Sequence, residues 1–337
     1  MVASTFGTAA CGKGPTPLVM YSSESPELLA YFERAFESSH PDVDVRVVEV
    51  SAGKALERLR AERKHPQADV WWGGPTEFFR RAADDSLLAS YRPGWADAVT
   101  SCDPDSLDRW HTLYLMPEVI AVNSDSVPLT LEPRDWRDLF HPRWADRILI
   151  RDPMTSGTMR TIFGALIYRE LRRTGDERAG FDWLLRLDAS TQQYLPSREM
   201  LLGHLARGTG VVTLWNLPDL ELALGARHTP LRVVLPESGS PVAEDAIAVV
   251  AGSPAAALAR AFVDFVGTKN ATLTAASRFY RIPARRDLAD GELPAWLVSI
   301  LKRLAPWDLD RDFIGAHLDG WMQRWDAEVR GKGKLLY

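Results

Sequence analysis

The chain has 337 residues, of which 46% are apolar and 25% are charged, and its formal net charge is −5. This length exceeds what one compact core usually holds, so two domains are expected, and the composition excludes a disordered chain. Basic residues are dispersed among acids without a domain-sized basic excess, so no nucleic-acid partner is expected. No apolar run approaches the roughly 20 residues needed to span a bilayer.

Residues 1–17 are predicted to form a leader or tether. The pattern Gly7-x4-Gly12-Lys13 matches most of a phosphate-binding loop, but Gly14 replaces the Ser or Thr that would hold magnesium, and prolines follow instead of a helix. Thr8 to Cys11 is similar to the end of a bacterial lipoprotein signal, with Cys11 as the lipidated residue. The charged start and apolar core of such a signal are missing, so a misplaced start codon and a plain disordered leader are the alternatives. A disulfide between Cys11 and Cys102 cannot be argued from two cysteines.

From Leu18 onward, short apolar runs alternate with amphipathic helices, which predicts an α/β fold with a largely parallel sheet. The first helix is expected to begin with Ser25 as N-cap and Pro26 at its first position. Strands are expected at residues 18–21, 43–50, 68–72, 113–123, 148–150, 211–214, 231–235 and 246–250. Helices are expected after Ser25, around Leu56, after a cap at Thr76, from Met159 to Gly175, and at 181–187, 197–205, 255–279, with two more at the end of the chain, the last over 313–329.

The first three predicted strands end in loops rich in Ser and Gly, and each loop precedes a helix N-terminus. These loops are Ser22-Ser23-Glu24, Ser51-Ala52-Gly53 and Gly73-Gly74-Pro75. In open α/β sheets, ligands bind beyond the carboxyl ends of the strands, so the loops should line one face of a crevice. The same composition also suits short strand-to-helix turns that bind nothing.

Residues 148–175 predict a strand that runs through a polar turn into a long helix. Ser156 or Thr155 is suited to cap the helix, and Gly157 would let a ligand approach the backbone where the first N–H groups are unpaired and the helix dipole is positive. This pattern is that of an anion site. An ordinary capped helix with a glycine for packing is the alternative.

Motifs for covalent or metal chemistry are absent from the sequence. The seven histidines lie far apart, and there is no HExxH, CxxC or G-x-S-x-G pattern. Five acids could include an acid/base pair, but solvated or capping roles are favoured for them: Glu24, Glu49, Asp152, Glu244 and Asp245. Binding without catalysis, and without a metal or other cofactor, is therefore expected.

Five segments together resemble the extracellular solute-binding proteins of ABC importers, in the subgroup that includes ferric-iron, sugar-phosphate and phosphonate binders. They are LVMYSSES, the Gly-containing loop after Val50, ADVWWGGPTEFF, ILIRDPMTSGTMRTIFGALI and ESGSPVAEDAIAVVAGSPA. The resemblance covers roughly residues 18–286. It implies the type II periplasmic-binding-protein fold, with a ligand cleft between two lobes, mixed and mostly parallel sheets, and helices on both faces.

The resemblance also implies a domain division. Residues 18–118 and 246–290 would form the first lobe, residues 119–245 the second, and residues 291–337 C-terminal helices that pack across the lobes. The ligand contacts carried over from the family are Ser22, Ser23, Ser51, Gly53, Gly73, Gly74, Thr155, Ser156, Gly157, Thr158, Trp215 and Asn216, with Glu244 or Asp245 before the return strand. Arg151 and Arg160 flank the helix start and could add charge-assisted bonds.

Ferric binders of this family use adjacent tyrosines after the strand equivalent to 211–214, where this chain has Trp215-Asn216. An indole has no anionic oxygen for Fe³⁺, so the expected ligand is a phosphorylated or phosphonate-type organic anion, with a carboxylate as a close alternative.

The resemblance implies capture by lobe closure, a membrane permease as partner, a monomer, and a periplasmic or cell-surface location. Three alternatives stay open: ferric-iron transport, ligand sensing for a membrane kinase, and an enzyme on the same scaffold.

Overall fold

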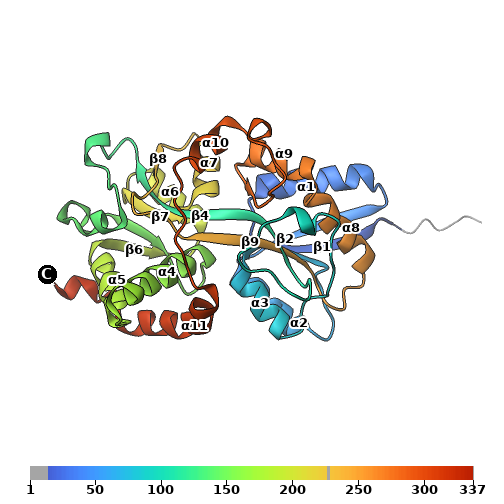
Figure 1. Ribbon diagram of the computed structural model, residues 1–337, viewed down its shortest axis with the longest axis horizontal. Helices are drawn as coiled ribbons and strands as arrows, with labels where there is room; N and C mark the ends of the chain where they lie inside the picture. The colour runs from blue at the N-terminus through green and yellow to red at the C-terminus, as the bar shows by residue number, and fades with distance from the viewer. Residues whose placement is uncertain (1–13, 226–227, 337) are drawn as a thin grey trace, which may run out of the picture.

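The computed structural model describes residues 14–225 and 228–336. Figure 1 shows two groups of elements, one at each end of the long axis, with β4 and β9 running between them. The strands are β1 (Thr16–Ser22), β2 (Val43–Glu49), β3 (Val70–Pro75), β4 (His111–Asn123), β5 (Ile148–Arg151), β6 (Thr191–Leu195), β7 (Val212–Asn216), β8 (Leu231–Val234), β9 (Val242–Val249) and β10 (Ile282–Pro283). The α-helices are α1 (Pro26–Ser39), α2 (Ala52–Glu62), α3 (Thr76–Asp84), α4 (Gly157–Thr174), α5 (Arg178–Ser190), α6 (Arg198–Ala206), α7 (Leu217–Gly225), α8 (Ala256–Val266), α9 (Lys269–Phe279), α10 (Ala295–Leu301) and α11 (Arg311–Glu328).

The strands form a mixed sheet in the order β2-β1-β3-β9-β4-β7-β5-β6, with β8 and β10 also paired to β4. Each antiparallel pair contains β4 or β9, and the remaining pairs are parallel. The first half of β4 pairs with β9 and its second half, from Glu118, pairs with β7. One continuous strand therefore belongs to both ends of the sheet, and the predicted α/β fold is confirmed.

Buried apolar side chains form cores at each end of the molecule. At the end built from β1 to β3, Phe32 and Phe36 of α1 pack with Phe262 of α8 on one face of the sheet. On the other face, α2 and α3 pack over Trp71, whose ring stacks on Phe79 at 4.0 Å. Helices α4 to α7, α10 and α11 contribute to a separate, larger core around β5 and β7. This distribution supports the division into two lobes predicted from the sequence, which we keep as a proposal.

Helix α11 carries the apolar stripe that the sequence predicts in the last helix. Leu318, Trp321 and Trp325 are buried, and Leu318 packs so closely on α4 that a Cβ added to Gly164 would lie 2.7 Å from its Cδ1. On its polar side, Asp319 pairs with Arg81 of α3 at 3.1 Å and with Arg160 of α4 at 2.6 Å. The helix thus contacts elements of both proposed lobes.

The predicted helix 255–279 is two helices in the structure. Gly267 ends α8 against Trp95, and Thr268 caps α9 by accepting a hydrogen bond from the N–H of Ala271. Two smaller predictions are also corrected: Thr76 is the first residue of α3 and not its cap, and strand β7 continues through Trp215-Asn216 instead of ending at residue 214. The Ser25 cap and the end of α4 at Gly175, which has a φ of 75°, are confirmed.

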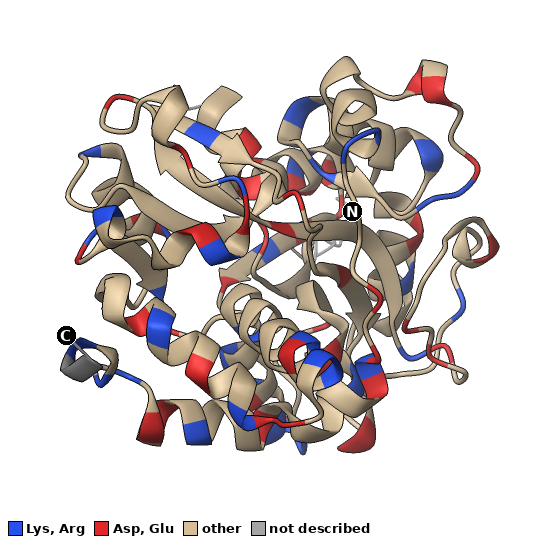
Figure 2. Ribbon diagram, turned by 60° about the vertical axis from the view of Figure 1, so that its left-hand side comes forward, with Lys and Arg blue, Asp and Glu red and all other residues tan. Residues whose placement is uncertain are grey.

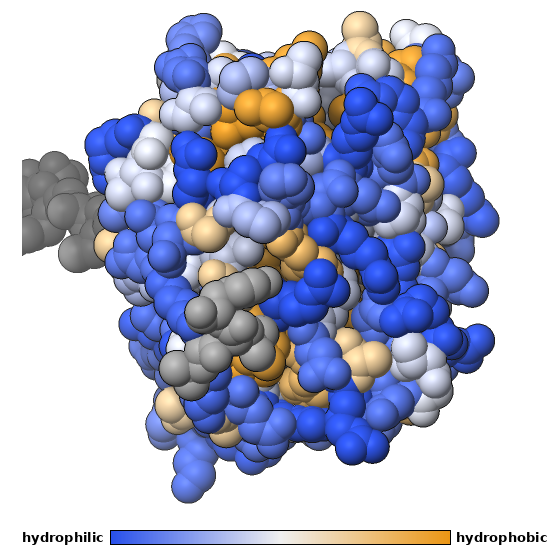
Figure 3. Space-filling view, turned by 90° about the vertical axis from the view of Figure 1, so that its left-hand side faces the viewer, coloured by the Kyte–Doolittle hydropathy of each residue, from blue (hydrophilic) through white to orange (hydrophobic). Residues whose placement is uncertain are grey.

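Acidic and basic residues are interspersed over the molecule (Figure 2). The end that carries α5 and the C-terminus is mostly hydrophilic, with apolar residues in small groups (Figure 3). No helix within residues 14–225 and 228–336 is long and apolar enough to span a bilayer. Cys102 is an exposed free cysteine, whereas Cys11 lies outside the described residues, so its lipidation stays a prediction.

Gly180 is expected to be essential for the packing of α5 on α4. A Cβ at this position would lie 2.6 Å from the Cα of Ile167, so Gly180→Ala should destabilise the fold by about 1–3 kcal/mol through overpacking. The matched control is Gly320→Ala on the exposed side of α11, where a Cβ meets nothing within 4 Å and helix propensity should stabilise by up to about 1 kcal/mol. Urea unfolding would measure both changes, and equal midpoints for the two variants would contradict this account.

Candidate functional site

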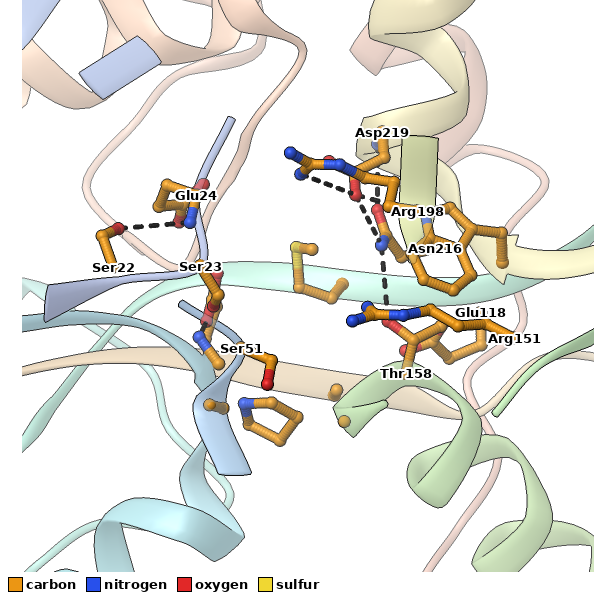
Figure 4. Close-up of a pocket in the computed structure, with 18 of the residues that line it drawn as sticks. Ser22, Ser23, Glu24, Ser51, Glu118, Arg151, Thr158, Arg198, Asn216 and Asp219 are labelled. Atoms are coloured by element: carbon orange, nitrogen blue, oxygen red, sulfur yellow. Dashed lines mark hydrogen bonds and ion pairs between the residues drawn. The ribbon is translucent and has the colours of Figure 1, made fainter. Parts of the chain in front are cut away.

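A cavity of about 270 Å³ lies between the two proposed lobes, at the carboxyl ends of β1, β2, β5 and β7. Figure 4 shows Ser22, Ser23, Glu24 and Ser51 on one side of it, and Arg151, Thr158, Arg198, Asn216 and Asp219 on the other. The lining residues are Ser22, Ser23, Glu24, Glu49, Val50, Ser51, Ala52, Gly74, Pro75, Met116, Glu118, Arg151, Gly157, Thr158, Arg198, Glu199, Trp215, Asn216, Asp219, Ala243, Glu244, Asp245 and Arg281.

In the first lobe, the loops after β1 and β2 place hydroxyl groups at the cavity. The Ser22 hydroxyl accepts a hydrogen bond from the N–H of Glu24 at 3.2 Å, so it holds its own loop. Ser51 stands at the N-cap of α2, yet its side chain caps nothing, and its buried hydroxyl has no hydrogen-bond partner in the described part of the chain. The Ser51 hydroxyl is therefore available to a ligand.

In the second lobe, the N-terminus of α4 reaches the cavity through Gly157 and Thr158. Ser156 is the N-cap and accepts a hydrogen bond from the N–H of Met159 at 3.3 Å, so its hydroxyl is occupied within the helix. A Cβ at Gly157 would lie 2.8 Å from the Cδ of Pro75, which belongs to the other lobe. The glycine thus allows the start of α4 to lie close to Pro75 at the edge of the cavity.

Arg151, at the end of β5, makes no ion pair within residues 14–225 and 228–336, although the charges of Glu199, Asp219 and Asp152 act on it. It lines the cavity 5.6 Å from the ring centroid of Trp215, and its Nε has no hydrogen-bond partner among the described residues. Burial lowers the pKa of Arg151, and the charge of neighbouring Arg198 lowers it further. Arg198 itself is 3.1 Å from Glu199 and 3.7 Å from Asp219.

Arg281 connects the two lobes through a buried ion-pair network. Its guanidinium lies 2.7 Å from Glu24 in the first lobe and 3.2 Å from Asp219 in the second, and the side chains of Arg281 and Glu24 are 1% exposed. Burial alone would raise the pKa of Asp219. The charges of Arg198 and Arg281, with hydrogen bonds from Asn216 and Trp215, outweigh it and lower that pKa to about 2.

Trp215 and Asn216 orient Asp219 as well as lining the cavity. The Trp215 indole N–H and the Asn216 amide each donate to the Asp219 carboxylate at 3.1 Å. The Asn216 amide also lies 3.5 Å from the Thr158 hydroxyl. A ligand at the α4 N-terminus would consequently contact side chains whose positions are already held.

Glu244 and Asp245, the two acids of β9, differ in the number of hydrogen bonds that they accept. Glu244 accepts hydrogen bonds from Ser101 and Thr112 and from the backbone of Cys102, so its role is to hold the 101–103 loop. Asp245 accepts from the N–H of Gly74. Burial raises the pKa of Asp245 well above its usual value, and the neighbouring Glu24 raises it further.

Ten of the fourteen predicted contacts line the cavity: Ser22, Ser23, Ser51, Gly74, Gly157, Thr158, Trp215, Asn216, Glu244 and Asp245. Four do not: Gly53, Gly73, Thr155 and Ser156. Gly53 lies within α2 facing Phe78, and Gly73, with a φ of 97°, turns the chain beside Ser23. Thr155 is exposed, and the hydroxyl of Ser156 caps α4. Of the two flanking arginines, Arg151 lines the cavity, whereas Arg160 pairs with Glu77 and Asp319 outside it.

Sequence reasoning missed several charged residues of the cavity wall: Glu118, Arg198, Glu199, Asp219 and Arg281. Glu118 could have been singled out from the sequence, because it is the one charged residue within the apolar segment 113–123. Arg198 and Glu199 stand at the start of a helix that the sequence predicts. Arg281 had no such signal, since only the return of the chain after α9 brings it to the cavity.

Comparisons with known proteins identify the family of this chain. Residues 68–298 match the family described as bacterial extracellular solute-binding protein. The chain is 26% identical over 317 residues to the probable ABC transporter periplasmic-binding protein y4fP of Sinorhizobium fredii, covering 93% of this chain and 86% of that one. It is 26% identical over 292 residues to a putative 2-aminoethylphosphonate-binding periplasmic protein of Salmonella typhimurium, covering 84% and 82%.

Solved structures share the fold. The periplasmic binding protein AfuA of Actinobacillus pleuropneumoniae, with exogenous fructose-6-phosphate bound, superposes with a TM-score of 0.82 at 25% identity, covering 95% of this chain and 99% of that one. Iron-bound HitA of Pseudomonas aeruginosa gives a TM-score of 0.77 at 19% identity, covering 92% and 99%, a likeness of fold alone.

The predicted periplasmic-binding-protein fold is thus confirmed, and the family consists of binding proteins and not of enzymes. Because the family model matches more than half of the sequence, the chain belongs to the bacterial extracellular solute-binding proteins, the substrate-binding components of ABC transporters.

Proposed function

We propose that this protein captures a small organic anion, of the phosphonate or phosphate-ester type, between its lobes and presents the closed form to a membrane permease. The observation that carries the proposal is Arg151, a cavity-lining guanidinium with no ion pair among the described residues. A charge taken out of water without a partner is costly, so an anion bound beside it would be strongly favoured.

The surroundings of Arg151 favour an oxyanion. The N-termini of α4 and α6 both open on the cavity through Gly157, Thr158 and Arg198. The first N–H groups of a helix lack intrahelical partners and carry a partial positive charge, so they are suited to phosphonate or phosphate oxygens. The Trp215 ring beside Arg151 offers an apolar surface to the carbon part of such a ligand.

Closure follows from contacts that only the closed form makes. The free Ser51 hydroxyl lies in the first lobe, and Arg151 and Thr158 lie in the second. A ligand that spans both sets stabilises the closed form over the open one, and the permease can read that difference.

The names of relatives support a phosphorus-containing ligand, since the Salmonella relative is named for 2-aminoethylphosphonate and AfuA holds fructose-6-phosphate. A carboxylate remains the close alternative.

Two observations argue against ferric iron as the ligand. Strand β7 ends in Trp215-Asn216, where tyrosines would be needed. No group of three or more His, Cys, Asp or Glu in residues 14–225 and 228–336 is placed to hold a metal. Sensing for a membrane kinase would use the same cavity, and no observation favours it. We also propose a monomer.

Arg151→Met removes the unpaired guanidinium and keeps its apolar stem. A melting-temperature screen of 2-aminoethylphosphonate, sugar phosphates, inorganic phosphate and carboxylates first identifies the anion that stabilises the wild-type protein most. Calorimetry should then show that this anion binds Arg151→Met roughly 10- to 100-fold more weakly than wild type, because a charged hydrogen bond is lost. Arg173→Met, an equal charge change at the exposed far end of α4, is the control and should leave affinity unchanged. Failure of every anion to raise the melting temperature would refute the proposal, as would equal affinities for both variants.

Gly157→Val should impair closure, because its side chain would meet Pro75 of the opposite lobe. We expect weaker ligand binding together with a loss of the ligand-induced decrease in radius of gyration, measured by small-angle scattering. Gly53→Ala is the matched control, since its Cβ would make ordinary contact with Phe78 at 3.6 Å and does not face the ligand. A normal decrease in radius for Gly157→Val would show that this contact does not govern closure.

A further inference from the structure

Glu118 is a buried acid of the cavity wall that the anion proposal does not use. It lies in β4, is 1% exposed, and lines the cavity. It makes no ion pair with a described residue, and its Oε2 has no hydrogen-bond partner in that part of the chain. The charged groups that act on it are Asp219 of α7 and Asp245 of β9, and both are acids.

The other charged residues of the cavity pair with one another, accept hydrogen bonds or face solvent. Seven carboxylates and three guanidinium groups line it. Arg281 pairs with Glu24 and Asp219, and Arg198 pairs with Glu199. Glu244 and Asp245 accept hydrogen bonds from hydroxyl and backbone groups, and Glu49 is exposed to solvent. Arg151 and Glu118 remain, one cation and one acid without partners among the described residues.

We propose that the captured solute carries an ammonium group that pairs with Glu118, so that the solute is a small zwitterion with its anionic group at Arg151. This inference rests on the proposed function, because it assigns the second charge of the same ligand. An ammonium offers three N–H donors and a compact positive charge, which is what a buried carboxylate without a cation lacks.

The charges around Glu118 bear on this assignment. Burial raises the pKa of Glu118 well above its usual value, and the charges of Asp219 and Asp245 raise it further. These surroundings favour the protonated form of the carboxyl group over the carboxylate. A bound ammonium would favour the carboxylate, so binding should release a proton from Glu118.

The test compares two matched ligand pairs by calorimetry: 2-aminoethylphosphonate with ethylphosphonate, and β-alanine with propionate. In wild-type protein the aminated member of at least one pair should bind roughly 10- to 100-fold more tightly than its partner. Repetition in two buffers of different ionisation enthalpy should reveal release of a proton with the aminated ligand.

Two variants separate the charge of Glu118 from the net charge of the protein. Glu118→Gln should abolish both the preference for the aminated ligand and the proton release. Glu57→Gln removes the same formal charge at an exposed position of α2 that does not line the cavity, and it should change neither.

The possible outcomes distinguish this inference from the function on which it rests. Equal affinity within both ligand pairs would overturn the ammonium site and leave the proposed anion capture intact, and so would an unchanged preference in Glu118→Gln. Equal affinity is the result expected if a protonated Glu118 donates a hydrogen bond to the anion. Binding of a sugar phosphate but of neither zwitterion would also overturn it. Binding of no anion at all would refute the proposed function itself.

A stability measurement without ligand shows that Glu118→Gln folds and tests the charge state directly. Because the folded-state pKa of Glu118 is raised, the folded form binds the extra proton, and its stability falls as pH rises above the usual glutamate range. The unfolding midpoint of Glu118→Gln should therefore rise relative to wild type between about pH 4 and pH 7. A constant difference across this range would contradict the buried, protonated acid.

Discussion

The ion-pair network of Arg281 with Glu24 and Asp219 is the interaction on which the cavity depends. It joins the loop after β1, the start of α7 and the segment after α9, which are distant in sequence. Removing one partner from such a buried network typically costs about 3–5 kcal/mol, because the remaining charge is left uncompensated. The network therefore holds the cavity wall on both sides, and it also occupies Arg281, which is thereby unavailable as the main anion contact.

In the proposed function, ligand recognition depends on the polar groups of the cavity that have no partner among the described residues. Several side chains of the cavity hold one another: Trp215 and Asn216 donate hydrogen bonds to Asp219, and Arg281 pairs with Glu24. Buried groups without partners are rare in folded proteins because each one costs free energy. Arg151, Ser51 and Glu118 are exceptions of this kind, and a zwitterionic solute would satisfy two of them with its charges and the third with an oxygen.

The sequence predicted most of the loops that line the cavity, but it did not point to most of the charged residues in the cavity wall. The Ser and Gly loops after β1 and β2 and the turn into α4 could be read because a strand followed by a capped helix has a local signature. The prediction of Ser156 as a ligand contact failed because the Ser156 hydroxyl accepts the hydrogen bond that caps α4. Gly157 was expected to admit a ligand, and its contact with Pro75 adds a role between the lobes that no local pattern encodes.

What the sequence by itself determined is the alternation of strands and helices, the caps at Ser25 and Gly175, and the Ser156-capped N-terminus of α4, because each depends on residues within a few positions. The tertiary structure decided which charges are free. Arg151 and Arg160 look alike in the sequence, yet Glu77 and Asp319 neutralise Arg160 and no described residue pairs with Arg151. Charge compensation acts across space between distant segments, so only the folded chain shows that Arg151 and Glu118 line the cavity without an ion pair among the described residues.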